Sequence, residues 1–300
     1  MEAQVMEIRV LEYFLTVARE QNISRAADYL HMTQPTLSRQ LKSLEDEFGK
    51  QLFIRGKRRI SLTEDGNRFR KMADEIVSLA KRAETEMRTS AETLAGDIYI
   101  GTGESIAIQN IIQTANLIQK NHPGVHFHFT SGDTSDLTDR LDKGLFDFCI
   151  FYGEVDQSKY EQIDLPYKET MGLLMLKDLP LAKKDRIDTS DLWDIPLIIS
   201  RNSMSSPGFF RWIGKSAEEL NISNTTNLVY TAMLMAKEKM GYVLTLDNLV
   251  NTEGTDLCFR PVLPHMSVRL SLVWKKYRTQ SRAAERFLAE LIRKYEITSD

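Results

Sequence analysis

Residues 21–62 carry the pattern that most constrains the fold of this 300-residue chain. From residue 33 onward the apolar positions are spaced by four, three and four residues, at Leu37, Leu41, Leu44 and Phe48. This spacing predicts a helix with one apolar face. Thr33 is suited to cap its start, and Pro35 fits the first turn, where an amide hydrogen would have no helical partner. The sequence therefore predicts a helix that begins near Gln34 and packs one side on a core.

The opposite face of this helix carries side chains that hydrogen-bond base edges and phosphates in DNA grooves. They are Gln34, Thr36, Ser38, Arg39 and Lys42. Upstream, Ser24 can cap a shorter helix in which Ala26 and Ala27 allow close packing. A charged amphipathic helix taken alone is usually a solvated surface, so the prediction of DNA binding also needs the segment downstream of this helix.

Downstream of Gly49 the pattern changes to two short β-like runs, 52–54 and 60–62, separated by a basic tip. They predict a β-hairpin whose cations reach phosphate or the minor groove beside the helix. The candidate cations are Arg55, Lys57 and Arg58. The joint order of small-residue helix, proline-started helix and basic hairpin predicts a winged helix-turn-helix that binds double-stranded DNA.

These residues resemble the N-terminal domain of LysR-type transcriptional regulators. The resemblance rests on Ala26-Ala27, Leu30, Gln34-Pro35, Leu37-Ser38, Leu44-Glu45, Gly49, Leu52-Phe53, Arg55 and Leu62-Thr63. In that family the start of the recognition helix and the wing touch DNA. A residue-by-residue match implies DNA contacts from Gln34, Pro35, Thr36, Ser38, Arg39, Arg55 and Lys57. The sequence departs from the family at Ile54, where an acidic residue is frequent.

A long helix is predicted next, capped by Thr63 and uninterrupted by proline through Leu94. It carries an apolar seam at heptad-like spacing, formed by Phe69, Met72, Ile76, Leu79 and Ala83. We interpret the seam as a dimerisation surface; the alternative is that it packs on the rest of its own chain. A homodimer would place two recognition helices on two half-sites. The family resemblance implies that dimers pair again into a homotetramer.

From Gly96 onward, short apolar runs alternate with amphipathic segments. The predicted strands are 98–100, 125–130, 146–151, 171–176, 197–199, 227–229, 242–245 and 266–274. This alternation predicts two Rossmann-like α/β subdomains joined by two crossings, near 165–166 and 261–264. The pattern resembles the periplasmic-binding-protein-like effector domain of LysR-type regulators. Near Gly241 the sequence departs from the family, because the proline that often follows there is missing.

Ligands of open α/β sheets bind beyond the carboxyl ends of the strands. The candidate effector-binding residues in those loops are Thr102, Gly103, Glu104, Ser105, Thr130, Ser131, Tyr152, Ser200, Arg201, Asn202, Tyr230 and Thr245. The set is suited to a small anionic or polar metabolite, and Glu104 adds an amine-bearing or zwitterionic ligand as an alternative. Each Ser or Thr taken singly is more often a helix cap, so only their common position at strand ends supports a site.

Composition limits the remaining function classes. The net charge is −3, yet cations are concentrated in residues 39–59, which predicts a local basic surface on a mildly acidic body. With no apolar run of about 18 residues, we expect a cytoplasmic protein without a membrane segment. Two cysteines are too few for a disulfide framework, and for Cys149 a buried thiol is favoured over a redox sensor. No triad, nucleotide loop or metal motif is recognisable, so we expect no enzyme, no metal and no cofactor besides the effector.

The predicted architecture has three parts: a winged helix-turn-helix domain over 1–63, a linker and dimerisation helix over 64–94, and an effector-binding domain over 95–300. Subdomain one comprises 95–165 and 265–300, and subdomain two comprises 166–264. The predicted function is a sequence-specific transcriptional regulator whose DNA contacts are modulated by a small-molecule effector, with RNA polymerase as a further partner. Two alternatives stay open: a solute-binding or catalytic α/β body tethered to DNA, and an architectural DNA binder whose C-terminal half only oligomerises.

Overall fold

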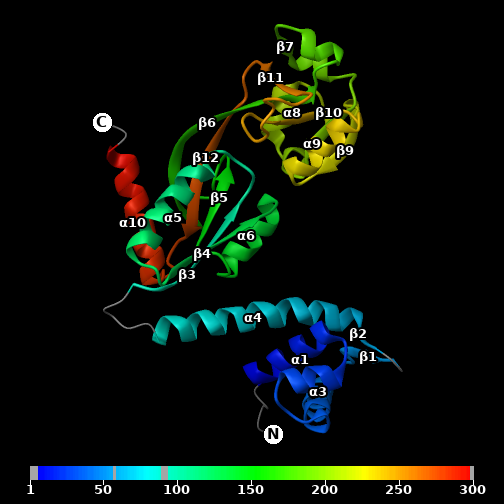
Figure 1. The fold of residues 1–300 in the computed structure, drawn as a ribbon, viewed down its shortest axis with the longest axis vertical. Coiled ribbons are helices and arrows are strands. Elements are labelled where there is room, and N and C mark those ends of the chain that lie inside the picture. Colours follow the sequence, from blue (N-terminus) through cyan, green and yellow to red (C-terminus); the bar gives the residue numbers. More distant parts are fainter. Residues whose placement is uncertain (1–5, 57–58, 89–93, 298–300) are drawn as a thin grey trace. The chain divides into compact units, whose positions relative to one another are not determined.

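The computed structural model of the chain describes residues 6–56, 59–88 and 94–297 and divides after residue 90 into two compact units (Figure 1). The first unit contains, in chain order, α1 (Ile8–Glu20), α2 (Ile23–Tyr29), α3 (Gln34–Phe48), β1 (Phe53–Arg55), β2 (Ile60–Leu62) and α4 (Glu64–Arg88). Strands β1 and β2 pair antiparallel. This order confirms the predicted winged helix-turn-helix.

The apolar face predicted for α3 packs into the core of the first unit. Leu37, Leu41 and Leu44 are buried against α1 and α2, whose buried side chains include Leu11, Phe14, Val17, Ala26 and Ala27. Phe48, at the end of the helix, is 39 % exposed, and its ring centroid lies 5.1 Å from that of Phe69 in α4. The alternation of apolar and polar positions therefore turns the opposite face of α3 to solvent.

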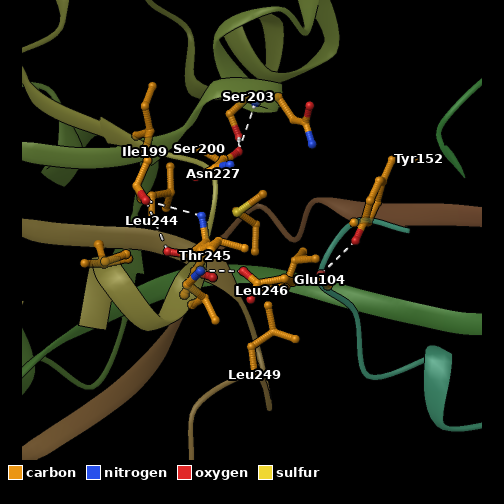
Figure 2. Close-up of a pocket in the computed structure, with 18 of the residues that line it drawn as sticks. Glu104, Tyr152, Ile199, Ser200, Ser203, Asn227, Leu244, Thr245, Leu246 and Leu249 are labelled. Atoms are coloured by element: carbon orange, nitrogen blue, oxygen red, sulfur yellow. Dashed lines mark hydrogen bonds between the residues drawn. The ribbon is translucent and has the colours of Figure 1, made fainter. Parts of the chain in front are cut away.

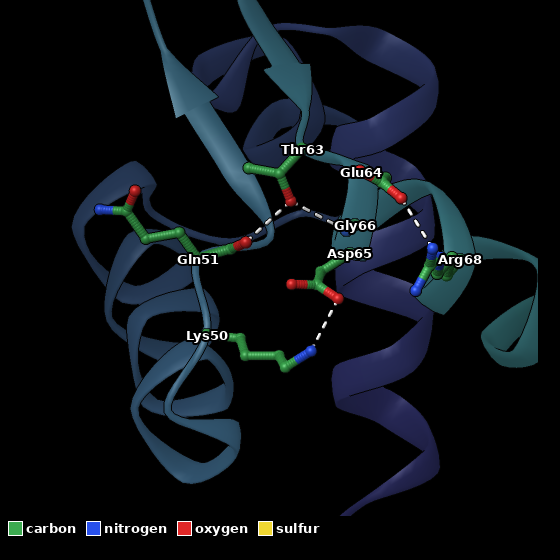
Figure 3. A network of polar contacts seen from close by, with 7 residues as sticks. All are labelled: Lys50, Gln51, Thr63, Glu64, Asp65, Gly66 and Arg68. Carbon is green, nitrogen blue, oxygen red and sulfur yellow. Dashed lines mark hydrogen bonds and ion pairs between the residues drawn. The ribbon is translucent and has the colours of Figure 1, made fainter.

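A polar network joins the wing to the start of α4 (Figure 3). The Thr63 hydroxyl donates to the Gln51 carbonyl oxygen at 2.7 Å and accepts from the Gly66 amide at 2.9 Å. Lys50 Nζ lies 2.7 Å from Asp65 Oδ1. A Cβ atom on Gly66 would lie 2.1 Å from the Leu52 carbonyl oxygen, so only glycine permits this close approach. The predicted capping role of Thr63 is confirmed.

Helix α4 has two apolar sides. Ala73 and Val77 are buried in the core of the first unit, while Met72, Ile76 and Leu79 are 58 %, 36 % and 36 % exposed. These three residues of the predicted seam are therefore exposed within the first unit, and their use in dimerisation stays a prediction. The prediction that the helix continues to Leu94 is wrong at that residue, which is not helical and packs against the apolar core of the second unit.

The second unit alternates strands and helices. Its elements in the first half are β3 (Gly96–Thr102), α5 (Ile108–Asn121), β4 (Val125–Ser131), α6 (Thr134–Asp142), β5 (Phe148–Tyr152) and β6 (Tyr160–Leu176). They are followed by η1 (Pro180–Lys183), β7 (Ile187–Asp188), η2 (Thr189–Leu192), β8 (Leu197–Ser200), α7 (Arg201–Met204), α8 (Pro207–Ile213), η3 (Ala217–Glu219), β9 (Ile222–Thr226) and α9 (Val229–Lys237). The chain ends with β10 (Tyr242–Leu246), β11 (Leu257–Leu263), β12 (Ser267–Lys275) and α10 (Arg282–Ile297).

Strand β6 belongs to both halves of this unit. Through Thr170 it pairs with β12, and from Met171 onward it pairs with β10 and β11. The strand order is therefore β4-β3-β5-β12-β6-β10-β8-β9. The first predicted crossing lies at 165–166, and the exchange of partners lies at 170–171. The second crossing is the segment between β11 and β12, which confirms two α/β subdomains joined by two connections.

Helices cover both faces of each half. In the first, α5 and α10 pack on one face of the sheet and α6 on the other (Figure 1). In the second, α8 packs on one face and α9 on the other. The predicted strand 227–229 is wrong: the strand is β9, at 222–226, and Val229 begins α9. In the described part of the chain β9 pairs with β8 alone, and every residue of it after Ile222 is polar, so it gives little apolar signal.

Candidate functional site

The exposed face of α3 gathers the predicted DNA-contact residues of the first unit. Gln34, Pro35, Arg39 and Lys42 are exposed, whereas Thr36 and Ser38 are partly buried. The helix starts where predicted, since the Thr33 hydroxyl oxygen accepts from the Thr36 amide at 3.4 Å. Arg39 Nε donates to the Pro35 carbonyl oxygen at 3.4 Å, which keeps this guanidinium along the helix surface.

Glu45 fixes the wing against α3. Its Oε1 accepts from the amides of Leu52 and Phe53 at 2.7 and 2.9 Å, and its Oε2 lies 3.6 Å from Arg55 Nη2. Arg55 nevertheless keeps 48 % of its side chain exposed at the end of β1, where it pairs with Ile60 next to the loop of the hairpin. The other two predicted wing cations, Lys57 and Arg58, lie outside the described residues. Glu45 therefore positions the wing, and it belongs to the Leu44-Glu45 pair on which the family resemblance partly rests.

In the second unit a cavity of about 160 Å³ lies between the two α/β subdomains (Figure 2). Seven predicted effector-binding residues line it: Gly103, Glu104, Ser131, Tyr152, Ser200, Asn202 and Thr245. They come from the carboxyl ends of β3, β4, β5, β8 and β10 or from the loops that follow, as expected for an open α/β sheet. The structure thus brings residues of both subdomains to one cleft.

Five predicted effector-binding residues do not line this cavity: Thr102, Ser105, Thr130, Arg201 and Tyr230. The buried Ser105 hydroxyl instead donates to Glu169 at 2.9 Å. Arg201 Nε lies 3.4 Å from Asp133 Oδ2 across the two subdomains. Tyr230 is 66 % exposed. A position at a strand end therefore does not determine which way a side chain points.

Residues that the sequence did not reveal form much of the cavity wall. The polar ones are Ser203, Ser206, Thr226 and Asn227, and the apolar ones include Met171, Ile198, Phe209, Leu228, Val229, Leu246, Leu249 and Met266. Of these, Ser206 had a detectable signal, because it precedes Pro207 and caps α8 by accepting from the Phe209 amide at 3.3 Å. The apolar residues could not be told from ordinary core.

Two side chains bridge the cleft, each onto the first turn of a helix in the opposite subdomain. Glu104 Oε2 accepts a short hydrogen bond from the Val229 amide at the start of α9. Asn202 Oδ1 accepts from the Thr134 amide at the start of α6, at 3.0 Å. Tyr152 donates its hydroxyl proton to the Glu104 carbonyl oxygen at 2.7 Å (Figure 2). The oxygens of Glu104 and Asn202 are favoured at the positive end of a helix, and each of these two hydrogen bonds links the two subdomains.

A buried carboxyl lies beside this cleft, just before β6 exchanges partners. Glu169 is 1 % exposed, and its Oε1 accepts from the Ser105 hydroxyl and the Ile106 amide at 2.9 and 2.8 Å. Its Oε2 is buried without a hydrogen-bond partner in the described part of the chain. Burial raises the pKa of Glu169, the hydrogen bonds oppose this, and the negative charge of Asp247 adds to it.

Replacing Glu169 with Gln is expected to stabilise the protein increasingly as the pH rises. The pKa of Glu169 is raised in the folded state, so the protonated carboxyl contributes to the free energy of unfolding at pH values below its ordinary pKa. This contribution is lost as the pH rises through the raised pKa. The difference in melting temperature between Glu169→Gln and wild type should therefore move in favour of the variant from pH 4 to pH 7. Glu238→Gln, at an exposed site, is the control. A pH-independent difference would contradict this account.

Both cysteines of the described chain are buried. Burial raises the pKa of the Cys149 thiol to about 12 and also raises the pKa of Cys258. A rise from 9.0 to about 12 leaves roughly a thousandfold less thiolate at neutral pH, and thiolate is the reactive form. The structure therefore favours a structural role for Cys149.

We expect Cys149 to resist alkylation by iodoacetamide in the native protein. Mass spectrometry at pH 7 should show much slower modification than in the same protein unfolded in urea, because the native thiol is buried and its thiolate form is disfavoured. Native modification at the unfolded rate would show that this thiol is open to oxidants.

Residues 6–56, 59–88 and 94–297 contain neither a membrane-spanning helix nor a cluster of metal ligands. None of their helices is long and apolar enough to cross a membrane. No group of three or more His, Cys, Asp or Glu side chains in these ranges could hold a metal ion. The expectation that the protein uses no metal stays a prediction.

Comparison with known proteins gives matches along the chain. Residues 8–67 match the family "Bacterial regulatory helix-turn-helix protein, lysR family", and residues 91–296 match the "LysR substrate binding domain". The HTH-type transcriptional regulator BsdA of Bacillus subtilis (strain 168) is 32 % identical over 223 residues, which cover 72 % of this chain and 74 % of BsdA.

Solved structures show the same fold. The LysR family transcriptional regulator CbnR has a TM-score of 0.75 at 20 % identity, covering 96 % of this chain and 99 % of CbnR. Full-length CbnR complexed with its target DNA has a TM-score of 0.74 at 21 % identity, with the same coverage. With both domains matched, the chain belongs to the LysR family and is a DNA-binding transcriptional regulator with an effector-binding domain.

Proposed function

We propose that this regulator acts as a homodimer whose two copies of α3 enter successive major grooves of a dyad-symmetric operator. The observation that carries the proposal is the exposed polar face of α3 on a helix whose other face is buried. Arg39 and Lys42 supply cations on that face, and Gln34 supplies an amide at its first turn. Arginine suits guanine edges, and amides suit adenine edges.

The wing adds contacts that are independent of sequence. Arg55 stands at the end of β1, next to the loop of the wing, and we propose that Lys57 and Arg58 in this loop reach phosphate or the minor groove. Such cations increase affinity at low salt without choosing between base pairs. In this proposal Pro35, Thr36 and Ser38 complete the contacts of the α3 start, as the family resemblance implies.

Dimerisation is proposed to use α4, because Met72, Ile76 and Leu79 form an exposed apolar side of that helix. Two linked half-sites bind far more tightly than one. Residues 64–94 would then serve as the linker, residues 1–63 as the DNA-binding domain and residues 95–300 as the effector domain. We also propose a tetramer of two dimers, which would bend the DNA between its sites and change the access of RNA polymerase.

The cleft between the α/β subdomains is proposed as the effector site. It collects seven of the predicted residues, and Glu104 and Asn202 join its two sides. A ligand that prefers one relative position of the subdomains would shift the population of that state and so change DNA contacts. We propose that the regulator needs no metal or other cofactor, catalyses no reaction and works in the cytoplasm, where it meets its operators.

Selection from a pool of randomised duplexes at physiological salt tests the DNA-binding proposal. We expect enrichment of sequences with two inverted half-sites whose centres lie about 10 base pairs, or a multiple of this, apart. Retention of the pool without enrichment would mean non-specific binding to phosphates and would contradict the proposal. A single unpaired half-site would contradict the dimer.

A further inference from the structure

The charges around the effector cleft are unusual for a site that would receive an anion. Among the described residues that line the cavity, Glu104 is the one charged side chain. Much of the remaining wall is apolar, including Phe209, Leu228 and Met266. The one cation among the predicted effector-binding residues, Arg201, does not line the cavity, and its Nε lies 3.4 Å from Asp133 Oδ2. Among the described residues no cation lines the cavity, so the negative charge of an anionic ligand would enter this partly buried space uncompensated.

Three first-turn backbone amides beside the cleft already have acceptors. The first-turn amide of α9, at Val229, donates to Glu104 Oε2, and that of α6, at Thr134, donates to Asn202 Oδ1. At the start of α8, the Phe209 amide donates to Ser206. Helix N-termini bind anions through backbone amides that have no other acceptor. Here the protein supplies its own acceptors, and at α9 the acceptor is a carboxylate.

Glu104 also keeps acceptor capacity for a ligand. One oxygen, Oε2, is used at α9, whereas no described residue donates to Oε1. An ammonium group beside this carboxylate gains a charge-assisted hydrogen bond, while a second carboxylate meets a like charge at short range. The apolar wall can bury the carbon skeleton of the same ligand.

We propose that the cleft binds an apolar molecule that bears an amine, that Glu104 receives the amine, and that small carboxylates are rejected because Glu104 occupies the place of their charge. This inference rests on the proposed role of the cleft as the effector site. It resolves the choice between anionic and amine-bearing ligands in favour of the amine.

Three probes with a common phenyl group separate the possibilities: 2-phenylethylamine, phenylacetamide and phenylacetate. Isothermal titration of the full-length protein at pH 7 should show the amine binding at least about tenfold more tightly than phenylacetate. In Glu104→Gln, which keeps the size and an acceptor oxygen, this preference should fall by about tenfold or more. Glu154→Gln, at an exposed loop position, is the control and should keep it.

A second variant tests whether Glu104 occupies an anion position. Glu104→Ala leaves the Val229 amide without its acceptor, so acetate should raise the melting temperature of this variant and not that of wild type or Glu154→Ala. The proposal is overturned if phenylacetate binds the wild-type protein as tightly as the amine, or if the amine does not bind. If the wild-type protein shows no sequence-selective DNA binding, the proposed function is overturned, whatever the three probes show.

Discussion

Replacing both Ile76 and Leu79 with Asp is expected to lower operator affinity by about 10² to 10⁴-fold, the gain that linking two binding sites gives. Both side chains lie on the exposed apolar side of α4, and neither belongs to the first-unit core that holds Ala73 and Val77. Aspartates there would have to be buried at a helix–helix contact, which is costly for unpaired charges. The first-unit core should be unaffected, so each monomer keeps its recognition helix.

Fluorescence anisotropy with a selected duplex measures the affinity, and sedimentation measures the oligomer. Ser78→Asp with Thr85→Asp is the matched control, because both positions are exposed on α4 away from the seam and the variant adds the same charge. We expect it to stay dimeric and to bind normally. Unchanged affinity of the Ile76/Leu79 variant would remove this face of α4 from the account.

Replacing Arg39 with Ala is expected to cost about 1–3 kcal/mol of operator binding and to abolish discrimination at one base pair of each half-site. Arg39 is exposed on the face of α3 that turns away from the core, one turn beyond Pro35. A guanidinium there can form two hydrogen bonds with one guanine edge. Loss of these bonds removes the preference for that guanine.

Affinities for all single base-pair variants of the selected operator measure this effect. Arg70→Ala removes the same charge from an exposed position of α4 and should leave the profile of preferences unchanged. If Arg39→Ala weakens binding equally for every operator variant and lowers the salt dependence, Arg39 contacts a phosphate and does not read a base.

The DNA-binding half could be predicted closely because its signals are local. The spacing of Leu37, Leu41 and Leu44 alone determines which face of α3 is buried. The cap at Thr33 determines where the helix starts. The end of α4 was harder to place, since nothing in the sequence near Leu94 shows that this residue packs in the second unit.

The effector half could be predicted as a pattern but not in its details. Strand β6 appears in the sequence as a separate run from Met171 because its first part, from Tyr160, is polar on one side. The sequence does not reveal strand β9 for a similar reason, because an edge strand can consist mostly of polar residues and then lacks an apolar run. The alternation of elements survives such errors, because each half still needs helices on both faces of its sheet.

The cleft shows where sequence reasoning stops. Loops at strand ends were correctly expected to converge, yet Arg201 lies next to Asp133, a contact between residues far apart in the chain that local sequence cannot reveal. The apolar residues of the wall lie in runs that hydropathy alone does not distinguish from the core. The cap that Glu104 provides to α9 depends on the relative position of two subdomains, which only the fold determines.

The central claim, sequence-specific DNA binding through α3, is tested most directly by sequencing the genomic fragments that the purified wild-type protein and Arg39→Ala retain. We predict discrete peaks centred on dyad-symmetric sites for the wild-type protein and their loss for the variant. Diffuse retention of fragments by both proteins, with no shared site under the peaks, would contradict the claim and leave only non-specific binding to the DNA backbone.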